Sequence, residues 1–293
     1  MTITKAVIPA AGLGTRLLSA TKEQPKEMLP LFASSRDGRP TLKPLLQLVF
    51  EQLYDVGFRE FYFIVGRGKR IIEDHFTQDL SYLASLEGRG KNEHVANLSD
   101  FYKRLDDSNL LWINQPSCLG FGDAVLKAKA AIGGDDFLVH AGDTYMLSND
   151  NNHLRRLLEF FAAKKPEAAF IVKRMLDVKA RGVIQGREAS EGLYSVDKVV
   201  EKPDYPISNL AIEPIYLFRP SIFEALEKTQ PGKGGEIQLT DAIQIIIDSG
   251  REVVAWRLPD SYLRLDIGDP QSYWQALLSS HTHVSQSHDV TAQ

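Results

Sequence analysis

The stretch of residues 5–30 limits the possible folds more than any other, because it joins a short apolar run to a glycine-containing loop with basic residues. The run Ala6-Val7-Ile8 is typical of a buried strand, and small residues follow it at once. Arg16 lies in the loop, and Lys26 follows ten residues later within KEMLP. Backbone N–H groups in such a turn, together with basic side chains, bind phosphate groups. We therefore expect an α/β protein whose first strand leads into a phosphate-binding loop.

The glycines of this loop match neither of two common phosphate-binding motifs. A dinucleotide fingerprint has a third glycine three residues after its second, but the residue three positions after Gly14 is Leu17. A Walker A loop continues with Gly-Lys-Ser or Gly-Lys-Thr, which is not the case here. Spacing alone therefore leaves a structural turn and a phosphate site equally open. The two cations, Arg16 and Lys26, favour the phosphate site, since they suit a triphosphate.

The composition is that of an ordinary globular chain with a sizeable core. With 293 residues, of which 43% are hydrophobic, the chain is long enough for one large α/β domain. Its net charge of −4 gives no reason to expect nucleic acid or an anionic membrane as partner. The single cysteine, Cys118, excludes a disulfide within the chain and fits a reducing compartment. No signal peptide or membrane-spanning stretch is evident, so we expect a cytoplasmic protein.

Strand-like and helix-like segments alternate through the first half of the chain. Strands are expected at 61–65, 110–113 and 137–140, and helices at 41–57, 69–76 and 124–131, with a polar helical excursion at 77–109. In the second half, strands are expected at 168–173, 209–218, 251–258 and 261–267, a hairpin at 182–185 and 194–201, and helices at 220–228, 236–249 and 270–281. This order predicts a Rossmann-like, mixed but mostly parallel sheet flanked by helices. We expect a single domain over 1–284, with halves of about 1–150 and 151–284, and a disordered tail at 285–293.

Two aspartates follow expected strands, Asp143 in FLVHAGDT and Asp266 in RLDIGDP. An aspartate at the carboxyl end of a parallel strand lies where α/β sheets bind ligands, although a helix cap or a turn is an equally open interpretation. If the two carboxylates converged, they would suit Mg²⁺, which prefers few carboxylates together with phosphate and water oxygens. The sequence alone does not show that they converge.

The motif PAAGLGTR followed by PKEMLP resembles the signature of the sugar-1-phosphate nucleotidylyltransferases. The most similar branch is that of the bacterial-type UTP–glucose-1-phosphate uridylyltransferases, and the resemblance runs from Lys5 to about Leu278. The segment GGEIQLTDAI at 234–243 and the excursion at 77–109 favour this branch over the shorter thymidylyltransferases. The resemblance implies the nucleotide-diphospho-sugar transferase type of α/β fold, with the nucleotide bound by the first half and the sugar by the second.

The resemblance also assigns residues to the nucleoside triphosphate. It implies that the triphosphate is wrapped by the loop residues Ala11, Gly12, Gly14 and Thr15. Arg16 and Lys26 would contact the phosphates as catalytic residues. Gln115 and Gly120 match the segment that reads the base, and a Gln side chain offers a donor and an acceptor to a uracil or thymine ring. Without the family context, Gln115 would be interpreted as a surface-loop residue.

Three matching segments in the second half are assigned to the sugar phosphate. In the EKP motif, Glu201 would bind sugar hydroxyls, and Lys202, the third catalytic residue, would hold the phosphate. Asn209 lies in SNLAI, a segment that lies along the sugar pocket in the family. Gly182 matches a glycine whose backbone approaches the sugar.

The sequence departs from the family pattern at several of these segments. GFGDAV replaces the usual GLGHAV, so Phe121 and Asp123 are unusual beside the base-reading loop. Arg181 stands where a tyrosine is common, and Glu213-Pro214 replaces a Val-Gly pair. The first and the last of these changes bear on base and sugar preference, whereas the phosphate chemistry is unaffected.

The function implied by the resemblance is transfer of a uridylyl group from UTP to α-D-glucose 1-phosphate, giving UDP-glucose and pyrophosphate. Asp143 and Asp266 match the aspartates that hold the family's metal, so Mg²⁺ is the expected cofactor. The alternatives are a glucose-1-phosphate thymidylyltransferase or another hexose-1-phosphate nucleotidylyltransferase and, from a different class, a non-catalytic sugar-nucleotide-binding regulatory protein. Since relatives form dimers or tetramers, a homodimer or homotetramer is expected.

Overall fold

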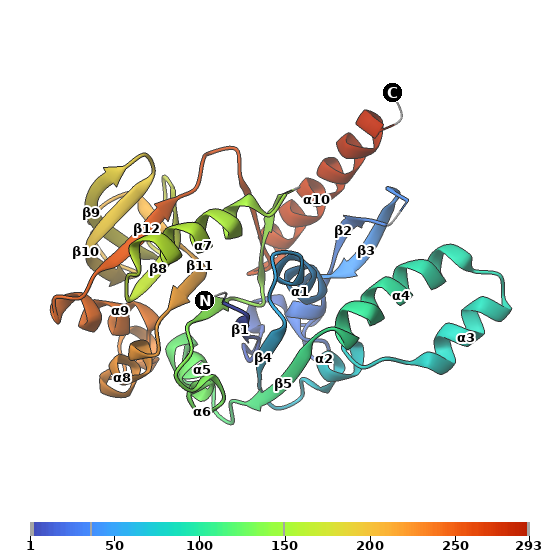
Figure 1. The fold of residues 1–293 in the computed structure, drawn as a ribbon, viewed down its shortest axis with the longest axis horizontal. Coiled ribbons are helices and arrows are strands. Elements are labelled where there is room, and N and C mark those ends of the chain that lie inside the picture. The colour runs from blue at the N-terminus through green and yellow to red at the C-terminus, as the bar shows by residue number, and fades with distance from the viewer. Residues whose placement is uncertain (1–2, 36, 149, 292–293) are drawn as a thin grey trace.

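The computed structural model describes residues 3–35, 37–148 and 150–291, and a nine-stranded sheet forms its centre (Figure 1). In chain order, the strands of this sheet are β1 (Lys5–Pro9), β4 (Glu60–Val65), β5 (Asn109–Asn114), β6 (Phe137–His140), β8 (Ala168–Arg174), β9 (Gly182–Ser190), β10 (Leu193–Glu201), β11 (Leu210–Phe218) and β12 (Val253–Arg257). Across the sheet the order is β5-β4-β1-β6-β11-β8-β12-β10-β9. β1 leads into the loop that is expected to bind phosphate, residues 10–16, which we call the phosphate loop. This strand therefore lies inside the sheet, between β4 and β6.

Seven of the nine strands point in the same direction. β5, β4, β1 and β6 pair in parallel, and β12 pairs in parallel with β8. β11 runs antiparallel to both β6 and β8, and β10 runs antiparallel to both β12 and β9. The prediction of a mixed, mostly parallel sheet is confirmed. The four adjacent parallel strands β5, β4, β1 and β6 all come from the first half of the chain. The segments between them, which contain helices, serve as the crossover connections that parallel strands need.

Helices cover both faces of this sheet (Figure 1). Ala6 and Ile8 of β1 belong to a hydrophobic core that includes α1 (Leu45–Asp55), α2 (Arg70–His75), α7 (Asn152–Lys164) and α10 (Pro270–Thr291). Val7 belongs to a second core, which includes α5 (Phe121–Lys127), α6 (Lys129–Ile132), α8 (Ser221–Lys228) and α9 (Leu239–Asp248). All three β1 side chains are fully buried. Burial on both faces explains why this strand is continuously apolar instead of alternating.

The excursion at 77–109 is helical, as expected. α3 (Leu80–Gly88) and α4 (Asn92–Asp106) form a pair that extends away from the sheet (Figure 1). α3 buries none of its residues, whereas α4 buries Phe101, Tyr102 and Leu105. The pair is therefore attached to the body mainly through α4.

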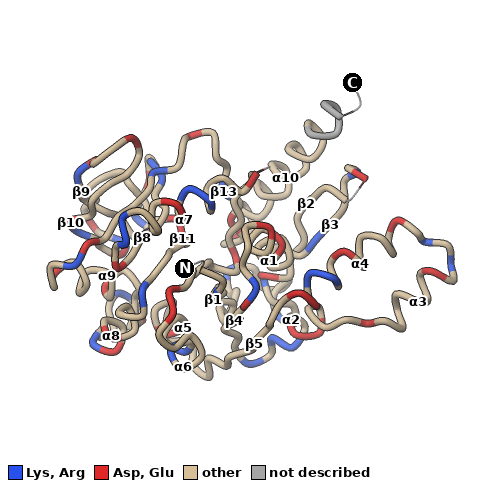
Figure 2. The backbone as a smooth tube through the Cα atoms, in the orientation of Figure 1, with Lys and Arg blue, Asp and Glu red and all other residues tan. Residues whose placement is uncertain are grey.

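Charged residues are distributed over the whole molecule, with acidic and basic side chains interspersed (Figure 2). This distribution agrees with the small net charge of −4. Within residues 3–35, 37–148 and 150–291, none of the helices is both long enough and apolar enough to cross a membrane.

The helix expected at 41–57 starts later than predicted, and several observed elements have no counterpart among the predictions. The helix expected from Thr41 begins at Leu45, because the preceding residues form β3 (Pro40–Pro44), which pairs with β2 (Pro30–Ser34). Pro44 explains the late start, since a proline disfavours helical backbone in the residue before it. Besides β2 and β3, the unanticipated elements include β7 (Thr144–Leu147) and α7. β7 pairs antiparallel with β13 (Leu263–Asp266) in a separate two-stranded sheet.

The last helix is longer than expected and replaces most of the expected disordered tail. The N–H of Ser272 donates to Asp269 Oδ1 (2.8 Å), so Asp269 caps the start of α10. Beyond the expected end at His281, the helix continues to Thr291. Its later turns have a surface to pack on, because Val284 is buried and the His281 ring contacts Phe32 of β2. The prediction of disorder is therefore corrected for residues 285–291, and positions 292–293 lie outside the described residues.

Candidate active site

An elongated cleft runs between the phosphate loop and the β9–β10 hairpin. It consists of three adjoining cavities of about 240, 200 and 220 Å³, which we call the loop, central and hairpin cavities. The loop and central cavities share Ala11, Gly12, Lys26 and Gln115. The central and hairpin cavities share Asp143, together with Phe121 and Ala141. Because their linings overlap, the three cavities form one cleft, with Asp143 at its middle.

The phosphate loop brings two of its four predicted nucleotide residues to the cleft. Ala11 and Gly12 line both the loop and the central cavities. Gly14 and Thr15 lie at the start of the short helix η1 (Thr15–Leu17), outside the lining of these cavities. Gly14 has a φ of 65°, a conformation that favours glycine, and its carbonyl accepts a hydrogen bond from Thr21 Oγ1 (2.8 Å). In this structure its role is therefore to shape the turn.

The two basic residues of the opening stretch lie beside the two predicted metal aspartates. Lys26 Nζ donates a hydrogen bond to Asp143 Oδ2, and the Lys26 side chain is largely buried. Burial opposes the charge of Lys26, but the attraction of Asp143 outweighs it, so the pKa of Lys26 is raised and the ammonium group stays protonated. Arg16 is exposed, and its guanidinium reaches the turn at Gly268, directly after Asp266.

The structure brings Asp143 and Asp266 together. Asp266 ends β13, where its cross-strand partner is Thr144, the residue after Asp143. The N–H of Ile267 donates to the backbone O of Asp143 (3.3 Å). Burial and the repulsion of Asp143 raise the pKa of Asp266, as expected for two carboxylates that share a site.

This carboxylate pair fits a Mg²⁺ ion that shares its coordination with phosphate. Among the described residues, no cluster of three or more His, Cys, Asp or Glu side chains could hold a metal by itself. Mg²⁺ does not need one, since one or two carboxylates with substrate phosphates and water complete its octahedral shell. The mutual repulsion of Asp143 and Asp266 would also be relieved by a bound cation.

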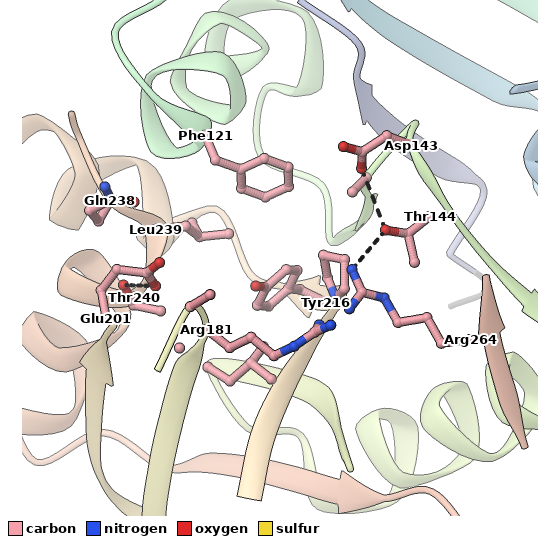
Figure 3. Close-up of a pocket in the computed structure, with 15 residues that line it drawn as sticks. Phe121, Asp143, Thr144, Arg181, Glu201, Tyr216, Gln238, Leu239, Thr240 and Arg264 are labelled. Carbon is pink, nitrogen blue, oxygen red and sulfur yellow. Dashed lines mark hydrogen bonds between the residues drawn. The ribbon is translucent and has the colours of Figure 1, made fainter. Parts of the chain in front are cut away.

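Two arginines that the sequence analysis does not assign to the site, Arg181 and Arg264, line the hairpin cavity (Figure 3) and connect this pair to a buried glutamate. Arg264 Nη2 lies 3.2 Å from Asp266 Oδ2 and donates to Thr144 Oγ1 (3.3 Å), while Arg264 Nε lies 3.1 Å from Glu213 Oε2. Arg181 lies 4.0 Å from both Glu213 and Asp266. Two departures from the family pattern, Arg181 and Glu213, therefore meet in space. Their unusual character was visible in the sequence, but their contact depends on the fold.

Glu213 is the most deeply buried carboxylate of this network. Its side chain is 0% exposed, and neither of its oxygens has a hydrogen-bond partner of good geometry among the described residues. Burial raises the pKa of Glu213 to about 7, although the positive charge of Arg181 opposes the shift. Glu213 therefore changes its charge near neutral pH.

The hairpin cavity contains Gly182 and Glu201 but excludes Asn209. A Cβ at Gly182 would lie 2.8 Å from Thr240 Cγ2 and 3.1 Å from Ile212 Cδ1, so no side chain fits there. Glu201 Oε2 accepts a hydrogen bond from Thr240 Oγ1 (3.1 Å), and burial raises the Glu201 pKa. Asn209 is exposed and does not line this cavity.

Lys202 directly follows Glu201 but, like Asn209, is not one of the residues that line the hairpin cavity. Its backbone has a φ of 43°, which is unusual for a residue with a side chain, and its N–H donates to the backbone O of Arg181 (2.9 Å). Lys202 Nζ lies 3.5 Å from Glu201 Oε1 and is partly exposed. The ammonium group is therefore close to Glu201 of the cavity lining, and no shorter ion pair to it is formed by residues 3–35, 37–148 and 150–291.

Gln115 lines both the loop and the central cavities, and Gly120 lines the central one. Gln115 is buried at the end of β5, and its N–H donates to the backbone O of Val65 (2.8 Å). Gly120 has a φ of 109°, and a Cβ there would lie 2.8 Å from the backbone O of Ile237. Only glycine fits this position, which sets the loop against the segment before α9.

The loop cavity also contains basic residues that the sequence analysis did not identify. Lys69 Nζ lies 2.9 Å from Glu27 Oε2 in a buried ion pair, and burial raises the pKa of Glu27 while Lys69 opposes this. Lys22 and Arg67 line the same cavity. The GRGKR segment around Lys69 carries the basic residues, but no spacing rule connects it to the opening loop.

The chain is similar over most of its length to several known proteins. A UTP–glucose-1-phosphate uridylyltransferase of Streptococcus pyogenes is 40% identical over 279 residues, which cover 91% of this chain and 85% of the relative. The structure of a UDP-glucose pyrophosphorylase complexed with UDP-glucose superimposes with a TM-score of 0.81, at 31% identity, covering 96% of this chain and 99% of the other. A UTP-bound UGPase from Acinetobacter baumannii superimposes with a TM-score of 0.82, at 29% identity, covering 95% of this chain and 93% of the other.

The family model described as Nucleotidyl transferase matches residues 5–283, nearly the whole chain and all of the cleft. The phosphate loop, the aspartate pair and the EKP hairpin all lie within the matched residues. The chain therefore belongs to the nucleotidyl transferase family.

Proposed function

We propose that this protein transfers a uridylyl group from UTP to α-D-glucose 1-phosphate and releases pyrophosphate. The observation that carries the proposal is the single cleft that joins the phosphate loop to the EKP hairpin, with Asp143 at its middle. Such a cleft can hold two phosphorylated substrates end to end. Proteins named for this reaction are similar to the chain over most of its length.

In the proposed reaction, an oxygen of the sugar phosphate attacks the α-phosphorus of UTP. A new P–O bond joins the two phosphates as the bond to the β-phosphate breaks, and pyrophosphate leaves with the electron pair. The reaction needs no covalent enzyme intermediate, so the side chains act by positioning two anions and offsetting their charge. Lys26 and Arg16 would contact the triphosphate, and Lys202 would hold the attacking phosphate. The raised pKa of Lys26 keeps its charge available for this task.

We further propose that Asp143 and Asp266 hold a Mg²⁺ ion. When bound, the ion would supply positive charge to the phosphates and relieve the repulsion between the two carboxylates. Lys26 contacts Asp143 and Arg264 contacts Asp266, so two positive charges already lie beside the two carboxylates.

The experiment that tests the proposed function is pyrophosphate release with glucose 1-phosphate and each nucleoside triphosphate in turn. UTP is expected to give the highest kcat/KM, and clearly faster turnover with dTTP would favour the thymidylyltransferase alternative. Binding of UDP-glucose without any pyrophosphate release would favour the regulatory protein. The cytoplasmic location and the homodimer or homotetramer stay predictions, and light scattering of the purified protein tests the latter.

A further inference from the structure

The side chain of Asp123 fixes the orientation of the Gln115 amide. Gln115 Nε2 donates hydrogen bonds to Asp123 Oδ2 (2.7 Å) and to the backbone O of Gly120 (3.2 Å). An ionised carboxylate only accepts hydrogen bonds, so the amide must turn its NH₂ group towards Asp123. Gln115 and Asp123 are only 3% and 5% exposed, so water does not compete strongly for these groups.

Asp123 is itself held in place by a second contact. Lys127 lies one turn further along α5, and its Nζ is 3.0 Å from Asp123 Oδ1. Each carboxylate oxygen therefore has its own partner, Gln115 or Lys127. The start of α5 is also anchored, because the N–H of Gly122 donates to the backbone O of Ile237 (2.9 Å). If the Asp123 side chain moved away from Gln115, its contact with Lys127 would therefore be lost as well.

This arrangement leaves Gln115 with one free group. The NH₂ group has two hydrogens, and Asp123 and Gly120 accept both. No described residue donates a hydrogen bond to Gln115 Oε1, and that atom is not one of the buried atoms left without a partner. Gln115 lines both the loop and the central cavities. The Gln115 side chain therefore offers a ligand in these cavities a hydrogen-bond acceptor and no donor.

We propose that Asp123 is a specificity-determining residue that makes Gln115 select a pyrimidine with an N–H at ring position 3. Uracil and thymine have that N–H, whereas the N3 of cytosine is itself an acceptor. A cytosine in the same place would face Oε1 with a lone pair, and both groups would lose hydrogen bonds in a dry site. The inference rests on the proposed function, in which Gln115 faces the base. It also gives a role to the replacement of the usual histidine at position 123.

The test is the steady-state kinetics of Asp123→Ala with UTP, CTP and dTTP at saturating glucose 1-phosphate. Without the carboxylate the amide can rotate, so we expect the UTP-to-CTP ratio of kcat/KM to fall by about tenfold. The fall should come mainly from a higher KM for UTP, with little change in kcat. The UTP-to-dTTP ratio should not change, because the two bases have the same N3–H. An unchanged UTP-to-CTP ratio, or an equal loss with all three nucleotides, would overturn the inference.

Two matched variants distinguish a change in the orientation of the Gln115 amide from a general loss of activity. Asp123→Asn keeps an oxygen that can accept from Gln115 Nε2, and Lys127→Ala removes only the other partner of Asp123. Both should keep the UTP-to-CTP ratio within about twofold of the original protein. If Asp123→Ala does not yield folded protein, Asp123→Leu, which fills the space, gives the same readout. If the unaltered protein does not prefer UTP, the proposed function fails, whereas an intact preference that Asp123→Ala leaves unchanged overturns this inference alone.

Discussion

Asp266 is the cross-strand partner of Thr144, the residue that follows Asp143, where β13 pairs antiparallel with β7. This pairing places the two aspartates together, although the two strands come from opposite halves of the chain. Arg264 extends from the same strand and contacts Asp266. It also donates a hydrogen bond to Thr144 Oγ1, which Figure 3 shows. The short β7–β13 sheet is thus the support on which the proposed metal site is built.

We predict that Asp143→Ala abolishes turnover at every Mg²⁺ concentration tried, because it removes one of two carboxylates that would hold the ion. Titration with Mn²⁺, followed by electron paramagnetic resonance, should show weaker metal binding in the same variant. Asp260→Ala, which changes an exposed aspartate shortly before β13, is the matched control and should leave both readouts unchanged. Near-normal turnover of Asp143→Ala would remove Asp143 from the metal site.

Lys202→Met should reduce kcat/KM for glucose 1-phosphate by about 10²-fold, since an unneutralised phosphate would have to approach the triphosphate. The KM for UTP should change far less, because Lys202 is next to Glu201, which lines the hairpin cavity and not the loop cavity. Lys198→Met provides the control, since Lys198 is an exposed residue of β10, the strand that ends just before Lys202. If both lysine variants behave alike, Lys202 has no special role in holding the sugar phosphate.

Gly182→Ala should weaken glucose 1-phosphate binding, because its Cβ would lie 2.8 Å from Thr240 Cγ2 and force the cavity wall to move. We expect the KM for the sugar phosphate to rise by about tenfold, as a small displacement in a positioned site is costly. Gly134→Ala adds a methyl group where no atom lies within 4 Å and serves as the control. A Gly182→Ala protein with unaltered KM would contradict the placement of the sugar in this cavity.

Glu213→Gln should change the pH dependence of stability. The pKa of Glu213 is raised from 4.5 to about 7 in the folded protein, so the folded state holds this proton more tightly than the unfolded state. Its stabilising contribution is therefore complete below about pH 4.5 and is lost as the pH rises through about 7. Glutamine cannot ionise, so the Tm of Glu213→Gln relative to the original protein should be higher at pH 8 than at pH 5.

The control for this measurement is Glu224→Gln, which changes an exposed carboxylate on α8. Its Tm difference from the original protein should be similar at both pH values. A Tm difference for Glu213→Gln that also stays constant between pH 5 and pH 8 would mean that Glu213 does not titrate in this range.

The sequence predicts the sheet well where periodicity is strong. A strand that is buried on both faces, such as β1, needs a continuous apolar run, and such a run is visible locally in the sequence. The alternation of strand-like and helix-like segments is visible in the same way. The sequence does not predict β7 after Asp143, because this strand is only four residues long and pairs with a distant strand. The start of α1 was misplaced because the proline-bounded hairpin before it has no strong pattern of its own.

The candidate site was predictable only in part, for a related reason. Motifs identify Lys26, Asp143 and Glu201, and the fold places all three along one cleft. The contact of Arg181 with Glu213 depends on how the start of β9 meets the middle of β11, which no spacing in the sequence specifies. The hydrogen bond from Gln115 to Asp123 likewise joins a loop to a helix, and only the three-dimensional arrangement reveals it.

The most direct test of the central claim is a competition experiment in which equal amounts of UTP, dTTP, CTP, ATP and GTP are supplied with glucose 1-phosphate and Mg²⁺. Mass spectrometry of the products identifies every nucleotide sugar formed. The account predicts that UDP-glucose is the main product and that pyrophosphate is released in equal amount. A different main nucleotide sugar, or no nucleotide sugar at all, would contradict it.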